Sequence, residues 1–171
     1  AKADAIFFVA MPPGWHITQG PGSVFYQPEY QARGNFAIEV EIFLFPNSSA
    51  EEYGLFTGGR SLDAGATYTA FVARRDGQAP VLDRKPASVV PVANWTPNSA
   101  VLPAKGPDPV KNVLRVEAGA AEVVFSVNGA VVTKHPRASL AMDGLFGLRI
   151  GKGINVHVSR LDLTHRLAPA K

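Results

Sequence analysis

The sequence contains no cysteine, which excludes disulfide bonds, zinc–thiolate sites and thiol nucleophiles. Charged residues are scarce at 18%, whereas hydrophobic residues make up 46%, so the chain is not of the disordered type. Segments free of both glycine and proline are also scarce. The longest is 154–168, and its first half alternates with a period of two rather than 3.6. A helix bundle is therefore excluded, and the composition favours an all-β protein.

Charge of one sign does not dominate any part of the chain. The net charge is +3, and the densest basic groups are only the pairs Arg74-Arg75 and Arg84-Lys85. Nucleic-acid binding needs basic residues massed on one face, so no nucleic-acid partner is predicted. The apolar run 5–11 is too short to cross a bilayer and lacks the basic flank of a signal peptide. We expect a first strand or a packed arm there, and no transmembrane segment.

The strongest strand signal is residues 35–45, which alternate between two faces. The first face is entirely apolar and predicts a core face: Phe36, Ile38, Val40, Ile42 and Leu44. The second face carries two carboxylates beside two aromatic rings: Glu39, Glu41, Phe43 and Phe45. A purely solvated face would not need those rings.

Similar patterns predict further strands over 53–57, 66–75, 110–117, 122–127, 130–133, 144–151 and 154–164. The proline-interrupted runs 81–82 and 89–95 are typical of edge strands or loops. Residues 96–109 have four prolines and no periodicity, which predicts a long irregular loop.

Two dipeptides predict the turns between strands, and one break in the alternation predicts a bulge. Asp76-Gly77 and Asn128-Gly129 predict tight hairpin turns, because type I′ turns need positive φ at both central residues. In the last strand, the apolar alternation resumes one residue out of phase, which predicts a β-bulge near Ser159-Arg160. About a dozen short strands without crossover helices predict an antiparallel two-sheet β-sandwich. We expect one domain over 1–171, with its core at about 13–164 and an arm at each end.

Several motifs carry a resemblance to a known fold family. They are Gly14-Trp15, the strand opened by Gly34-Asn35-Phe36, and the segments 68–72, 112–117, 123–129 and 144–151. This pattern resembles concanavalin A-like lectin and glucanase jelly rolls, in particular laminin-G-like and 3-keto-disaccharide hydrolase-like domains of exported bacterial proteins. The resemblance covers 13–164 and implies an exported protein, periplasmic or extracellular. One departure is Lys111, where relatives often carry tryptophan.

Glu39 and Glu41 are the sharpest candidates for chemistry. Residues i and i+2 of a strand lie about 6.6–6.8 Å apart on one face, close to the carboxylate separations of glycosidases. The resemblance implies a Glu-x-Asp-x-x-Glu motif in the endo-glucanases of this superfamily, but its third acidic position is Leu44 here. The alternative is that both carboxylates pair with cross-strand arginines. No catalytic residue is therefore assigned beyond these two weak candidates.

A second set of polar residues alternates with apolar neighbours and should point away from the core: Arg115, Glu117, Arg149 and His157. If their strands share a sheet with Glu39 and Glu41, that face could bind sugar hydroxyls or a polar protein surface. The alternative is a salt-bridge lattice of little net energy. Trp95, followed by Pro97 in an irregular run, could stack on a sugar or plug the long loop.

The four histidines have no metal-ligand spacing, and the isolated aspartates do not form a calcium-binding run. We predict no metal site and no cofactor. A structural calcium ion would be compatible with the loops, but no sequence motif encodes a site for it. The preferred hypothesis is a non-catalytic extracytoplasmic recognition module for glycan or protein, using Glu39, Glu41, Arg115, Arg149, His157 and Trp95. The alternatives are an accessory subunit of a larger periplasmic or membrane-associated assembly, and a glycoside-cleaving enzyme using Glu39 and Glu41.

Overall fold

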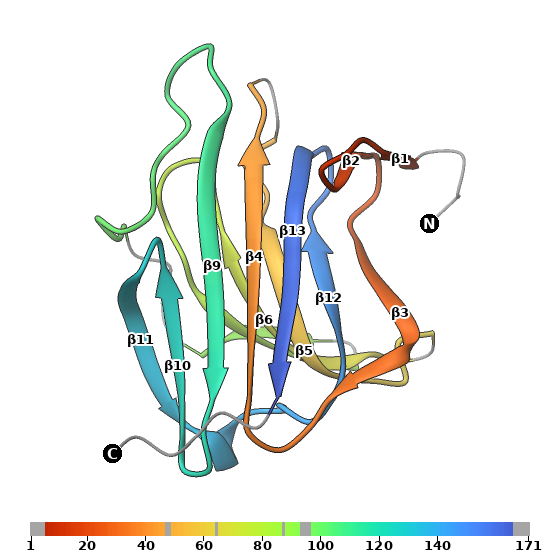
Figure 1. The fold of residues 1–171 in the computed structure, drawn as a ribbon, viewed down its shortest axis with the longest axis vertical. Helices are drawn as coiled ribbons and strands as arrows, with labels where there is room; N and C mark the ends of the chain where they lie inside the picture. Colours follow the sequence, from red (N-terminus) through yellow and green to blue (C-terminus); the bar gives the residue numbers. More distant parts are fainter. Residues whose placement is uncertain (1–5, 47–48, 64, 87, 93–96, 166–171) are drawn as a thin grey trace.

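The structure is a computed structural model that describes residues 6–46, 49–63, 65–86, 88–92 and 97–165. Two antiparallel sheets pack face to face as a β-sandwich (Figure 1). The seven-stranded sheet has the order β1 (Ile6–Ala10), β2 (Trp15–Gln19), β13 (Asn155–His165), β4 (Phe36–Leu44), β9 (Val110–Ala118), β10 (Glu122–Val127) and β11 (Ala130–Pro136). The six-stranded sheet has the order β3 (Ser23–Ala32), β12 (Gly144–Ile150), β5 (Tyr53–Arg60), β6 (Thr67–Ala73), β7 (Val81–Lys85) and β8 (Ser88–Pro91). The predicted fold class is confirmed.

The core lies between the sheets and follows the predicted alternation. On β4 the five apolar residues of the first face are buried, whereas Glu39 and Glu41 are partly exposed on the other face. The opposing sheet contributes side chains such as Tyr53, Leu55 and Phe71. Each large apolar side chain buried in this way stabilises the fold by about 1.5–3 kcal/mol.

The two hairpin dipeptides differ in geometry. Asn128 and Gly129 have φ of 51° and 82°, as a type I′ turn between β10 and β11 requires. The hairpin between β6 and β7 also exists, but only Gly77 has a positive φ, of 88°. There the Arg74 N–H donates to the Gln78 carbonyl and the Gly77 N–H to the Arg74 carbonyl. The type I′ prediction is therefore wrong at Asp76-Gly77, where a longer loop places only the glycine in the left-handed region.

The strand bounds confirm some predictions and correct others. The bulge in β13 lies where predicted, since the register to β4 shifts between Val158 and Arg160. The segment 81–82 is not an edge or loop, because β7 lies between β6 and β8, whereas β8 is an edge strand. Sequence patterns missed β2 and β3. In β3, Pro28 lies within a segment that bulges away from β12, so its alternation is broken.

A buried polar network anchors the long loop. The Asn112 side-chain amide donates to the Tyr53 hydroxyl at 3.1 Å and to the Leu102 carbonyl at 3.0 Å, and its oxygen accepts from the Leu102 N–H. Burial raises the pKa of Tyr53 to about 12, although the hydrogen bond from Asn112 acts in the opposite direction. The Asn128 side chain donates to Asn112 and to the Ala100 carbonyl. The described part of the predicted loop, from residue 97, is irregular apart from one bridge between Gln78 and Pro97.

Among the described residues the helical content is one short 3₁₀ turn, η2 (Arg137–Ser139). That part of the chain holds no helix with the length and apolar character needed to cross a membrane.

Candidate functional site

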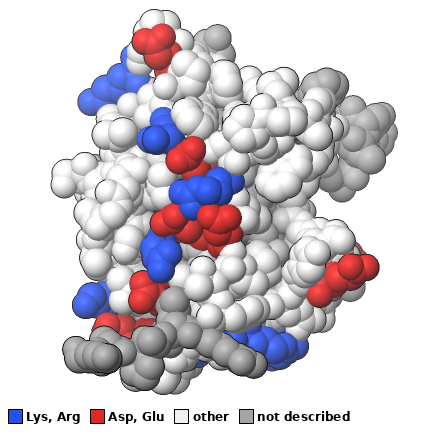
Figure 2. Space-filling view, in the orientation of Figure 1, with Lys and Arg blue, Asp and Glu red and all other residues white. Residues whose placement is uncertain are grey.

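The outer face of the seven-stranded sheet carries a group of charged residues that we call the charge ladder: Glu39, Glu41, Lys111, Arg115, Glu117, Arg160 and Asp162. It runs across β9, β4 and β13, which are neighbours in the sheet. Glu39 is directly opposite Arg115 on one side and Asp162 on the other. Figure 2 shows the ladder as a stripe of alternating sign between uncharged surfaces.

Contacts within the charge ladder occupy both candidate carboxylates. Arg160 Nη1 donates to Glu39 Oε2 at 2.6 Å and to Asp162 Oδ2 at 2.8 Å, and Arg115 Nη1 lies 3.9 Å from Glu39 Oε1. The Ser159 hydroxyl donates to Glu41 Oε1 at 2.7 Å, and Lys111 lies 3.9 Å from Glu41 Oε2. Hydrogen bonds with Asp162 and Glu39 raise the pKa of Arg160 further above its usual value. The structure therefore has the cross-strand pairing that the sequence left open as the alternative.

A shallow apolar depression of about 360 Å³ lies beside Glu41. Its wall includes Phe43, Phe45 and His157. The His157 ring lies 6.3 Å from the Phe43 ring, and its Nε2 is 2.7 Å from the Pro13 carbonyl oxygen. The structure therefore brings together Glu39, Glu41, Arg115 and His157 on one sheet face.

Arg149 does not belong to that face. It lies on β12 in the other sheet, where its Nη2 donates to Glu52 Oε1 at 2.9 Å. Burial raises the pKa of Glu52, but a backbone hydrogen bond and the Arg149 charge outweigh it, so the pKa lies below its usual value. Trp95, the remaining candidate, lies outside the described residues.

The outer face of the six-stranded sheet carries an apolar cluster beside a few charged side chains. A second hydrophobic group, which we call the outer cluster, lies on it: Phe56, Tyr68, Ala70, Val72 and Leu82. Side chains from β3, from β12 and from the segment 61–66 pack against this cluster. The sheet is therefore hydrophobic on both faces, unlike a sheet with one solvated face.

Beside the outer cluster lies a depression of about 430 Å³, which we call the sheet hollow. It is lined by Gly22, Ser23, Val24, Tyr26, Leu62, Asp63, Ala66, Tyr68, Arg84 and Arg149. Tyr26 meets Phe56 edge-on at 6.4 Å between ring centroids, and Phe56 is 5.3 Å from Tyr68. Two tyrosines fixed by packing thus border an open space that also contains charged groups of both signs.

Arg84 is the unusual group of the sheet hollow. It is directly opposite Tyr68 in the β6–β7 register, and its Nε is buried without a hydrogen-bond partner. A buried donor without a partner costs about 1–3 kcal/mol. In contrast, Arg149 is already bonded to Glu52. The hollow therefore combines two tyrosine rings, the Arg149 guanidinium held by Glu52, the Arg84 guanidinium with its unpartnered Nε, and the Asp63 carboxylate. This lining suits a polar ligand with an apolar face.

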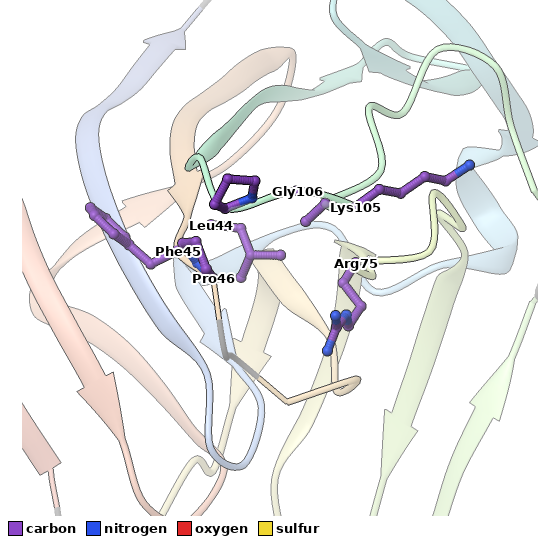
Figure 3. Close-up of a pocket in the computed structure, with 8 residues that line it drawn as sticks. Leu44, Phe45, Pro46, Arg75, Lys105 and Gly106 are labelled. Atoms are coloured by element: carbon purple, nitrogen blue, oxygen red, sulfur yellow. The ribbon is translucent and has the colours of Figure 1, made fainter.

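Another depression, of about 310 Å³, lies at the end of the sandwich where β4 meets the long loop. In Figure 3 the Lys105 side chain extends away from Leu44 and Pro46, and Arg75 lies across from Phe45. The remaining lining is aliphatic or glycine, so this end pocket offers fewer oriented polar groups than the sheet hollow. Within the described ranges no group of three or more histidine and acidic side chains could hold a metal ion.

Sequence reasoning did not bring the residues of the sheet hollow together, and it assigned Arg149 to a different sheet face. The signal for Arg84 was the basic pair Arg84-Lys85, but its neighbour Tyr68 depends on the length of the β6–β7 hairpin. A second signal was strand 67–73, which is apolar on both faces and therefore predicts a covered outer surface.

Comparisons with known proteins agree with the fold. No protein-family model and no curated sequence matches the chain. Among solved structures, a family 66 carbohydrate-binding module from Bacillus subtilis is similar, with a TM-score of 0.70 and 13% identity over 92% of this chain and 90% of that one. A galectin-like protein of unknown function from the same organism has a TM-score of 0.66 and 10% identity over 95% and 91%. Sheep galectin-11 in complex with glycerol has a TM-score of 0.59 and 13% identity over 83% and 98%. At these identities, the chain shares with them the jelly-roll β-sandwich fold of the concanavalin A-like type.

Proposed function

We propose that this chain is a glycan-recognition module that binds its ligand in the sheet hollow. The observation that carries the proposal is Arg84, a guanidinium with an unpartnered buried donor beside two packed tyrosines. Sugars present hydroxyl groups next to apolar C–H surfaces. A tyrosine offers a ring face and a hydroxyl, and a guanidinium offers several donors in a fixed plane. The structural neighbours include a carbohydrate-binding module and a galectin, which supports this class of ligand.

The charge ladder supports the proposal less well as the binding surface. A glycan bound over Glu39 would replace the two arginine contacts that this carboxylate already has. In the sheet hollow, a ligand could accept hydrogen bonds from the Arg84 guanidinium without displacing a hydrogen bond or ion pair of the described residues. Glycoside cleavage by Glu39 and Glu41 is less favoured for the same reason, because both carboxylates are engaged by neighbouring side chains. The finer resemblance to laminin-G-like and 3-keto-disaccharide hydrolase-like domains, the exported location and membership of a larger assembly remain predictions from the sequence.

The test is a glycan array followed by calorimetric titration of the saccharides that bind. Arg84→Ala should weaken binding more than tenfold, since losing a hydrogen bond to a charged group costs about 1.5–3 kcal/mol. Arg115→Ala is the matched control, an arginine removed from the opposite face, and should leave the affinity within about twofold. An array with no bound saccharide would overturn the function.

Glu41→Gln and His157→Gln test the other sheet face. If these variants abolish saccharide binding while Arg84→Ala has no effect, the ligand binds beside the charge ladder and the assignment to the sheet hollow is wrong. Tyr26→Ala should weaken binding together with Arg84→Ala, because Tyr26 lies in the wall of the same hollow.

A further inference from the structure

One side of the sandwich is only half closed. Strand β2 pairs with β13 only from Asn155 to Val158, whereas β13 continues to His165. Residues 159–165 therefore have β4 on one side and, within the described ranges, no strand on the other. Figure 1 shows the β1–β2 hairpin at one end of β13 only.

The reason for the half closure is local. Gly14 has φ of 93°, and a Cβ at this position would lie 1.8 Å from the Val158 carbonyl oxygen. The chain turns there, directly before β2 and beside the bulge at Ser159. The hairpin is held across the gap between the sheets by Phe8, whose ring stacks on Trp15 at 6.5 Å and on Phe25 at 5.7 Å. Beyond this aromatic contact, no strand of the described residues covers this side of the sandwich.

An apolar cleft lies directly below the open edge. Its volume is about 390 Å³, and it runs between the two sheets. From β13 it is lined by Leu161 and Leu163, and from the opposite sheet by Phe146 and Tyr30, which is 61% exposed. Leu161 and Leu163 alternate with Arg160 and Asp162 of the charge ladder, so one face of this strand edge is apolar and the other is charged.

We propose that this open edge binds an extended apolar segment of a partner protein, which adds as an antiparallel strand along residues 159–165 of β13. In an antiparallel ladder, every second residue turns its N–H and C=O away from its existing neighbour, here β4. These backbone groups recognise another extended backbone, a complementarity that a free lipid or sugar does not offer. Alternate side chains of the added strand would lie opposite Leu161 and Leu163 and enter the cleft. The partner segment therefore has apolar residues at every second position and no proline between them.

The opposite edge of the same sheet is a useful contrast. Strand β11 is also unpaired on its outer side among the described residues, and its exposed Val131 is 54% accessible. The cleft lining, however, comes from the β13 side alone, from β2, β3, β12 and β13. Backbone groups alone would favour both edges equally, so the cleft selects the β13 edge.

The experiment selects ten-residue random peptides, displayed on phage, against the immobilised full chain. We expect enriched peptides with alternating apolar residues. With a synthetic copy of one such peptide, amide hydrogen exchange should slow at least tenfold at alternate positions in 159–165. Methylating the backbone nitrogens of the peptide at one alternate phase should abolish binding, and methylating the other phase should not.

Two matched variants locate the site. Tyr30→Glu places a charge at the mouth of the cleft and should weaken binding at least tenfold, whereas Val131→Glu on β11 should leave it within about twofold. Circular dichroism would check that both variants fold. The proposal is overturned if no peptide is enriched, if only Val131→Glu reduces binding, or if peptides bind without amide protection and regardless of methylation.

Discussion

The outer faces of the two sheets differ in how their side chains find partners. On the seven-stranded sheet, charged side chains pair with one another in water, across three neighbouring strands. On the six-stranded sheet, aromatic and aliphatic side chains are buried against one another and against side chains from β3, β12 and the segment 61–66, and the Arg84 guanidinium keeps a buried donor without a partner. A dense group of charges can therefore be self-sufficient. The face with fewer charges is the one on which the Arg84 donor has no partner.

The sharpest test of this contrast is the outer cluster. Phe56→Ala should lower the free energy of unfolding by about 3–5 kcal/mol, because the ring is fully buried and its removal leaves a cavity. The measurement is urea denaturation followed by circular dichroism. Phe43→Ala, on the ladder face beside His157, is the matched control and should cost clearly less, since Phe43 is only partly buried. Equal losses would mean that the two outer faces do not differ in packing.

The polar network around Asn112 tests whether the stability of both sheets depends on the same buried contacts. Asn112→Leu should cost about 2–4 kcal/mol, because it leaves the Tyr53 hydroxyl and the Leu102 backbone groups without their buried partner. The loss of unfolding free energy should be the same whether the measurement reports on the seven-stranded or on the six-stranded sheet. Limited proteolysis should also become faster within residues 98–109. A loss below about 1 kcal/mol would show that the loop is held by other contacts.

Much of this arrangement was predictable from local pattern. The alternation in 35–45 gave both faces of β4, and the phase slip in 154–164 gave the bulge that places Ser159 beside Glu41. The sheet hollow was not predictable in this way. Tyr68 meets Arg84 only because the β6–β7 hairpin has a particular length, and Arg149 joins them only because β12 lies in the six-stranded sheet. Such long-range register is set by the packing of both sheets, which no short segment encodes.

The Glu52–Arg149 pair should have an intermediate effect. Glu52→Gln should cost about 1–3 kcal/mol at pH 7, since the pair is partly buried and Arg149 would keep a buried charge. The folded-state pKa of Glu52 is lowered, so its contribution is present above the ordinary carboxyl pKa and is lost as the pH falls through the folded value. The difference between wild type and variant should therefore shrink on acidification below about pH 4. A difference that stays constant down to pH 2 would contradict the assigned pairing.

The charge ladder should show the smallest effect, although it is the most conspicuous polar feature of the surface. Side chains at Glu39 and Arg160 are 27% and 38% exposed, so water competes for both groups. Exposed pairs typically contribute 0.2–1 kcal/mol, and a double-mutant cycle of Glu39→Gln with Arg160→Gln should give a coupling of about that size. Because Arg160 also contacts Asp162, the single change at Glu39 leaves it a partner and should cost less than Glu52→Gln. The coupling should fall between 0.05 and 1 M salt as screening shortens the range of the charges, from a Debye length of about 14 Å to about 3 Å. A coupling above about 2 kcal/mol that persisted in high salt would mean that the ladder is organised as a buried network, and would remove the distinction between the two faces.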